Sequence, residues 1–183
     1  VTVRGPSWSS ADHVTIYSNG RIIWEEAVTP NERPDIKFGR HLSLALPPHD
    51  AALVAVATGP GVLLPFWEVR KPYQPTSYEW NPRVLGVSSA VWIDGDNDGT
   101  RSAPLAYAER IVKDNATDLQ RLVEVLSSFD SSVSLHALDL LRNQGRDLAA
   151  PEIRTMFDRA TSTREAYKLY ASELAQIRSD PKP

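Results

Sequence analysis

The chain contains no cysteine. Disulfide bonds, thiolate zinc sites and cysteine nucleophiles are therefore excluded together. No apolar run approaches the roughly 18 residues of a membrane-spanning helix, so no membrane span is expected. The net charge is −3 and no block of basic residues occurs. We therefore expect no nucleic-acid surface, because such a surface depends on Lys and Arg to neutralise phosphates.

Glycine and tryptophan are almost confined to the first part of the chain. All five Trp and eight of the nine Gly precede residue 104. Short apolar segments separated by turn residues fill that part, whereas apolar residues at helical spacing fill the rest. We therefore expect a β-rich domain over residues 1–103. A helical region over 104–183 is expected to pack on it or to form a small helical subdomain.

The apolar segments of the first part predict an immunoglobulin-like antiparallel β-sandwich without its disulfide. Asn19-Gly20 predicts a tight hairpin turn between strands at 14–18 and 21–25. Residues 41–46 alternate as a strand does, and the nearly continuous apolar run 52–57 predicts a strand buried on both faces. The remaining candidate strands are residues 1–4, 62–64, 84–87 and 90–93.

Helix signals begin at Pro104, which suits the first turn of a helix. Thr117 or Asp118 is a candidate N-cap for a second helix, and residues 132–141 carry a broad apolar stripe that ends at Gly145. Two further helices are expected, one starting at residues 150–152 and one opening at residues 163–165.

The most specific motif is the acidic segment 94–100. Asp94, Asp96 and Asp98 stand at alternate positions and Gly99 permits a sharp turn, which is the first half of an EF-hand calcium loop. The twelfth position holds Leu105 in place of the usual bidentate Glu. The pattern predicts a structural calcium site with side-chain ligands from the three Asp residues and the Thr100 carbonyl as a fourth ligand. The alternative is a solvated acidic turn.

Four aromatic residues gather in the proline-rich segment 65–83, which is expected to be a long irregular loop. Large rings on such a loop suit a partner surface or a carbohydrate ring, and core packing is the alternative. The residues concerned are Trp67, Tyr73, Tyr78 and Trp80.

No catalytic constellation is recognisable. His13, His41, His49 and His136 are scattered, without the HxH or HExxH spacing that preassembles a metal centre. His49 follows two prolines and is expected to be solvated in a turn. We therefore expect that the chain is not an enzyme by itself.

Three segments together resemble a known family. Residues 6–8 followed by 12–20 resemble the opening of the domain that follows the catalytic barrel in CehA/McbA-type metallohydrolases of the PHP superfamily. Residues 88–99 are similar to that family's closing strand and acidic loop, and residues 104–108 fit the helix that follows. The resemblance covers roughly residues 1–110.

The resemblance implies a noncatalytic accessory region. Hydrolysis in that family depends on a His- and Asp-rich metal centre in the barrel, and none of those residues can be placed here. The partner implied is therefore an N-terminal catalytic domain of the same polypeptide, on which this region packs or which it positions. The alternative function is an extracellular module that binds carbohydrate or another ligand. A calcium-like loop and the lack of cysteine favour an exported bacterial protein, periplasmic or extracellular.

Overall fold

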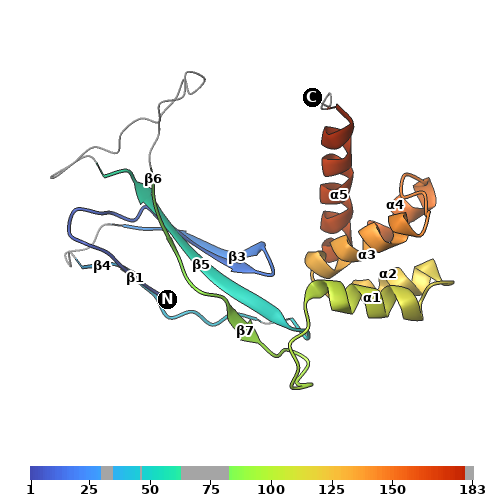
Figure 1. The fold of residues 1–183 in the computed structure, drawn as a ribbon, viewed down its shortest axis with the longest axis horizontal. Helices are drawn as coiled ribbons and strands as arrows, with labels where there is room; N and C mark the ends of the chain where they lie inside the picture. Colours follow the sequence, from blue (N-terminus) through green and yellow to red (C-terminus); the bar gives the residue numbers. More distant parts are fainter. Residues whose placement is uncertain (30–34, 46, 63–82, 180–183) are drawn as a thin grey trace. The chain divides into compact units, whose positions relative to one another are not determined.

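The computed structural model describes residues 1–29, 35–45, 47–62 and 83–179 (Figure 1). Strands come first and helices follow, which confirms the predicted order of a mixed β-then-α chain. The strands are β1 (Thr2–Arg4), β2 (His13–Ser18), β3 (Arg21–Ala27), β4 (Ile36–Gly39), β5 (Ala51–Pro60), β6 (Arg83–Val87) and β7 (Val91–Ile93). The helices are α1 (Pro104–Asp114), α2 (Leu119–Leu126), α3 (Ser131–Asn143), α4 (Pro151–Phe157) and α5 (Thr161–Ser179).

The described strands form two antiparallel sheets. One pairs β1 with β4, and the other has the order β3-β2-β5-β6, with β7 also paired to β5. The predicted hairpin is confirmed, because Asn19 and Gly20 have positive φ angles of 48° and 83° between β2 and β3. Positive φ at both central residues is what a type I′ hairpin turn requires.

The strand predicted at residues 41–46 is wrong for the part that the structure describes, since residues 41–45 form none. The partner of β1 is β4 instead, with Thr2 opposite Gly39. The Arg40 amide then bonds the Val1 carbonyl, so the pairing with β1 ends there. Alternating hydrophobicity alone could not reveal this register.

The register of the larger sheet assigns side chains to its two faces, because directly paired residues of an antiparallel sheet point the same way. Ile16 pairs with Trp24 and with Ala55, and the Trp24 ring lies 6.1 Å from the Phe38 ring of β4. We call this the inner face. It contains the buried Val14 and Ile16, which are 1% and 4% exposed.

The opposite, outer face of the larger sheet combines exposed apolar side chains with polar ones, among them His13, Thr15 and Thr58. On this face Tyr17 of β2 pairs with Ile22 of β3 and with Val54 of β5. Between β5 and β6, Val56 pairs with Val87 and Thr58 pairs with Leu85. Strand β5 is half-buried from Ala52 to Thr58, so the prediction that residues 52–57 are buried on both faces is wrong. Neither face encloses the strand, because Ala55 and Ala57, which pair with Ile16 and Val14 on the inner face, are half-buried as well.

The helices pack around one apolar core. Helix amphipathicity explains its composition, since each helix contributes a stripe of apolar residues three or four positions apart. The largest fully buried apolar side chains there are Phe157, Leu122, Leu126, Leu138 and Leu141. The predicted N-cap Asp118 is confirmed, because its side chain accepts a hydrogen bond from the Arg121 amide.

The chain divides into two compact units. Residues 1–45 and 52–91 form the β unit, and residues 46–51 and 92–183 form the helical unit. A single boundary near residue 103 was expected. The described part of the segment 46–51 and the acidic segment 94–100 instead belong with the helices.

Candidate functional site

The acidic segment after β7 is curled by its own side chains. Oδ2 of Asp94 accepts a hydrogen bond from the Gly99 amide at 3.0 Å, and Oδ1 of Asp96 accepts one from the Asp98 amide at 3.3 Å. Asn97 and Gly99 have positive φ angles of 57° and 74°. Asp and Asn favour such turns because their short side chains bond the backbone two residues on.

The structure brings two of the predicted ligands together with a residue that the motif did not contain. Oxygens of Asp50, Asp94 and Asp96 all lie within 4.8 Å of one another. We call these three residues the carboxylate cluster. Carboxylate oxygens are the ligands that hard cations such as Ca²⁺ prefer, so the cluster has the donor chemistry for one.

Asp98 does not belong to the carboxylate cluster. Its Oδ1 accepts hydrogen bonds from the Thr100 amide at 2.7 Å and from the Thr100 hydroxyl at 2.6 Å. These bonds, the side-chain one first, hold the pKa of Asp98 below its usual value of 3.8. Asp98 thus serves the turn itself, and ligation by the Thr100 carbonyl stays a prediction.

Asp50 is the member that sequence reasoning missed. It is 1% exposed, and its Oδ1 accepts from the Gly95 amide at 3.1 Å while Oδ2 accepts from the Ser102 amide at 2.6 Å. One buried carboxylate therefore fixes both ends of the acidic segment. The only sequence signal was an acidic residue directly before an apolar strand, a place where a charge is seldom buried without partners.

Gly95 is required where the acidic segment meets residues 47–49. A Cβ at Gly95 would overlap the backbone carbonyl of His49 and would lie 2.8 Å from the Pro47 carbonyl oxygen. Only glycine allows the backbone to approach so closely. The approach brings the Gly95 amide within reach of Asp50.

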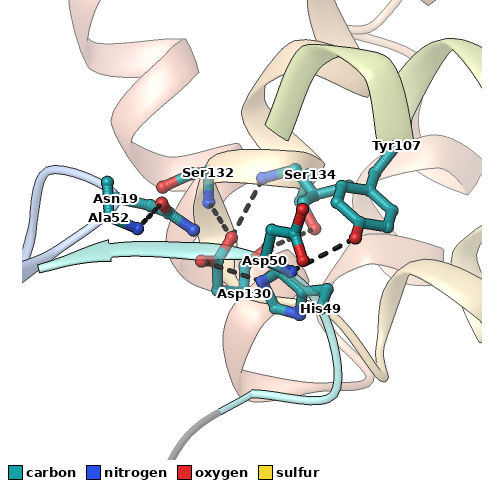
Figure 2. A network of polar contacts seen from close by, with 9 residues as sticks. Asn19, His49, Asp50, Ala52, Tyr107, Asp130, Ser132 and Ser134 are labelled. Atoms are coloured by element: carbon teal, nitrogen blue, oxygen red, sulfur yellow. Dashed lines mark hydrogen bonds and ion pairs between the residues drawn. The ribbon is translucent and has the colours of Figure 1, made fainter. Parts of the chain in front are cut away.

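Tyr107 connects the carboxylate cluster to α1. Its hydroxyl donates to Oδ2 of Asp96 at 2.7 Å. The same hydroxyl accepts from the Asp50 amide at 3.2 Å (Figure 2). Burial, followed by the hydrogen bond to Asp96, raises the pKa of Tyr107 to about 12. The phenol therefore stays protonated and holds α1 against the acidic segment.

His49 is buried, so the expectation that it is solvated is wrong. It is 0% exposed and packs against the rings of Tyr107 and Phe129, at centroid distances of 5.7 and 5.2 Å. Its Nε2 lies 3.1 Å from Oδ2 of Asp130, the N-cap of α3, but without the alignment of a hydrogen bond (Figure 2). The two prolines before it start a segment that is enclosed by the helices, and local sequence does not reveal that enclosure.

The predicted partner surface cannot be placed. Trp67, Tyr73, Tyr78 and Trp80 lie outside the described residues. Among the helices that the structure describes, none is both long enough and apolar enough to cross a bilayer.

The comparisons with known proteins identify no family for this chain. No family model, curated protein or solved structure was found to match the chain. The function must therefore be argued from the residues themselves.

Proposed function

We propose that this chain is a noncatalytic accessory module of an exported protein. In this proposal its β unit packs on a neighbouring domain of the same polypeptide and positions it. The resemblance to the region after the PHP-type barrel gives the class of that neighbour, a metal-dependent hydrolase. The observation that carries the proposal is the group of exposed apolar side chains on the outer face of the larger sheet.

The outer face exposes large apolar side chains of the kind that a partner domain would cover. Leu85 is 65% exposed, Val87 58% and Ile22 48%, and the half-buried Val54 and Val56 lie on the same face between them. Antiparallel sheets that face water normally carry polar residues on that side, as His13 and Thr58 do here, whereas these apolar side chains beside them are left exposed. Covering the three exposed side chains would stabilise an interface by roughly 1 kcal/mol each, because burying a whole side chain of this size contributes about 1.5–3 kcal/mol.

We also propose that the two sheets of the β unit are the layers of an immunoglobulin-like sandwich. The contact between Trp24 and Phe38 supports this, because the two rings come from different sheets. A cavity of about 540 Å³ is lined by apolar residues of both sheets, among them Val3, Val14 and Ile16, and by Leu42 and Leu44. Apolar side chains from two sheets around one interior are typical of a sandwich.

The carboxylate cluster is proposed to have a structural role in this module. A carboxylate oxygen carries more than one lone pair, so an oxygen that accepts a hydrogen bond could also ligate a cation such as calcium. A cation there would join the described segment before β5 to the acidic segment within the helical unit.

The test is binding in trans. The neighbouring catalytic domain is produced separately, and its affinity for this chain is measured by calorimetry. Leu85→Glu and Ile22→Glu are each expected to weaken binding about tenfold or more, because each places a charge in an apolar interface. Leu169→Glu is the matched control, since Leu169 is 49% exposed on α5, outside the β unit.

Unchanged affinity in both β-unit variants would refute the proposed docking face. A parent polypeptide without a metal-dependent hydrolase domain would refute the proposed partner. An assay of this chain alone against phosphoesters and carbamates tests its noncatalytic nature. Turnover that survives removal of trace metals and contaminants would contradict it.

A further inference from the structure

The cavity of the β unit, about 540 Å³ in volume, is much larger than the voids of an ordinary protein interior. Close-packed interiors contain few spaces that exceed one water molecule. Small-molecule sites typically measure about 300–1,000 Å³ and are mostly apolar, so the size and the lining of this cavity match those of a binding site. All of the lining residues that the structure describes belong to the β unit.

Small residues on the inner face of the larger sheet create this space. Ala55 pairs with Ile16, and Ala57 pairs with Val14 on one side and with Gly86 on the other. A Cβ at Gly86 would meet nothing within 4 Å, and the φ angle of Gly86 is not positive. Neither the backbone nor the neighbours therefore require glycine there. The cavity exists because these positions hold small side chains.

The interior of the cavity is suited to an aliphatic ligand. The apolar residues that line it are all Val, Ile, Leu or Ala. Ser88 lines it as well, but its hydroxyl already accepts from the Ala55 amide at 3.0 Å and donates to the Ser89 carbonyl at 2.9 Å. The volume allows for roughly twenty non-hydrogen atoms, scaled from the benzene that an apolar cavity of about 150 Å³ holds.

The charge at the edge of the cavity indicates the head group of that ligand. Arg4 is the single charged residue among the described lining residues, and its side chain is 70% exposed. Its Nη1 lies 4.0 Å from Oδ2 of Asp35, and an ion pair so long and so exposed is weak. The guanidinium has several N–H donors, so it can serve a second carboxylate. The cavity thus combines an aliphatic interior with a positive charge at its solvent-exposed edge.

We propose that this cavity binds a fatty acid. The aliphatic chain lies in the interior against Ile16, Ala55 and Ala57, and the carboxylate stays in water at the edge, where Arg4 supplies the opposite charge. This orientation follows because burying the chain removes apolar area from water, whereas burying the carboxylate would carry a large desolvation cost. The site uses the inner face of the larger sheet and is independent of docking at the outer face.

The probe is decanoate, with decanol as its neutral analogue, each titrated into the full chain at concentrations where it is dissolved as a monomer. Amide NMR spectra are expected to show saturable shifts at Ala55, Ala57 and Gly86, with a decanoate dissociation constant of about 0.1 mM for a ligand of this size. Arg4→Gln is expected to weaken decanoate binding about threefold, as an exposed charge pair does, and to leave decanol binding unchanged.

Filling the cavity tests whether the chain of the ligand enters it. Gly86→Leu should weaken the binding of decanoate and of decanol at least about tenfold, because the new side chain occupies their space. Ala57→Leu is a second filling variant with the same expected effect. Gly39→Leu is the matched control and should leave binding unchanged. Gly39 does not line the cavity, and a Cβ there likewise meets nothing within 4 Å.

Undiminished decanoate binding by the two filling variants would overturn the proposal, and so would an equal loss of binding in Gly39→Leu. A preference for the acid over the alcohol that Arg4→Gln leaves unchanged would contradict the assigned head group. The absence of saturable shifts at the cavity amides, together with a raised melting temperature of Gly86→Leu, would identify the cavity as a packing void.

Discussion

At the scale of single residues, Asp50 organises the acidic segment more than any residue within that segment does. Its two oxygens accept from the Gly95 and Ser102 amides, and its own amide donates to the Tyr107 hydroxyl. Buried carboxylates persist in proteins when their oxygens are hydrogen-bonded in this way. Three substitutions around Asp50 measure how much this arrangement contributes to the stability of the chain.

Tyr107→Phe should destabilise the chain by about 1–3 kcal/mol at neutral pH, because the Asp50 amide and Asp96 each lose a partner. The pKa of Tyr107 is raised from 10.0 to about 12. The folded state therefore favours the protonated phenol. This contribution to stability is complete below pH 10 and is lost as the pH rises from about 10 to 12. Denaturant unfolding at several pH values checks this: the difference between wild type and Tyr107→Phe should shrink above pH 10. A constant difference would contradict it.

Gly95→Ala should destabilise the chain by about 1–3 kcal/mol, because the added methyl group overlaps the His49 carbonyl and forces the backbone apart. Gly39→Ala is the matched control, since a Cβ there would meet nothing within 4 Å. Thermal unfolding of both variants provides the comparison. Equal melting temperatures would show that the close approach at Gly95 is not tight.

Calcium should raise the unfolding free energy by about 2.7 kcal/mol when its concentration is a hundred times the dissociation constant. Asp94→Asn should abolish this gain, because it removes a charge from the carboxylate cluster. Asp98→Asn, in the same segment but outside the cluster, should retain it. Melting temperatures with calcium and with chelator measure the effect. A wild-type midpoint that calcium leaves unchanged would leave only the solvated-turn interpretation.

At the scale of elements, local signals were reliable where the local chain determines the structure. Asn19-Gly20 formed the predicted hairpin turn, and Asp118 formed the predicted N-cap. Signals that depend on distant pairing were not reliable. Residues 41–45 alternate like a strand, but β1 pairs with β4 instead, and local sequence cannot specify a partner.

Two N-caps of the same residue type allow a matched comparison. Asp118→Ala should cost about 1 kcal/mol, the usual loss for an N-cap. Asp130→Ala should cost about 1–3 kcal/mol more. Asp130 bonds the Ser132 and Val133 amides, and its loss also removes the carboxylate that lies 3.1 Å from Nε2 of the buried His49. Chemical denaturation measures both variants. Equal losses would mean that the contact between Asp130 and His49 contributes nothing.

At the scale of the whole molecule, each of the two units is built from two separate stretches of the chain, whereas the composition indicated a single boundary between them. Residues 47–50 directly precede β5, which lies mostly in the β unit, yet they belong to the helical unit. Asp94 and Asp96 could be identified from sequence because they share one short motif. Asp50 could not, because only folding brings it to the motif, and the sequence separation between them carries no signal.

The outer face of the larger sheet also becomes visible only at this scale. The apolar run 52–57 correctly predicted a strand, and its expected burial on both faces was wrong for the chain alone. If the proposed neighbour covers that face, the apolar run 52–57 would be buried on both faces in the whole polypeptide, although it is not in this chain alone. The exposed side chains of β6 then mark the surface at which the two domains meet.

Hydrogen exchange of this chain alone and within its parent polypeptide tests the docking claim most directly. The account predicts that the amides of β6, between Arg83 and Val87, exchange more slowly in the parent, because the neighbouring domain excludes water from the outer face. Amides of α5 around the exposed Leu169 serve as the internal reference and should be unchanged. Exchange in β6 that is equally fast in both proteins, or added protection confined to the helical unit, would contradict the account.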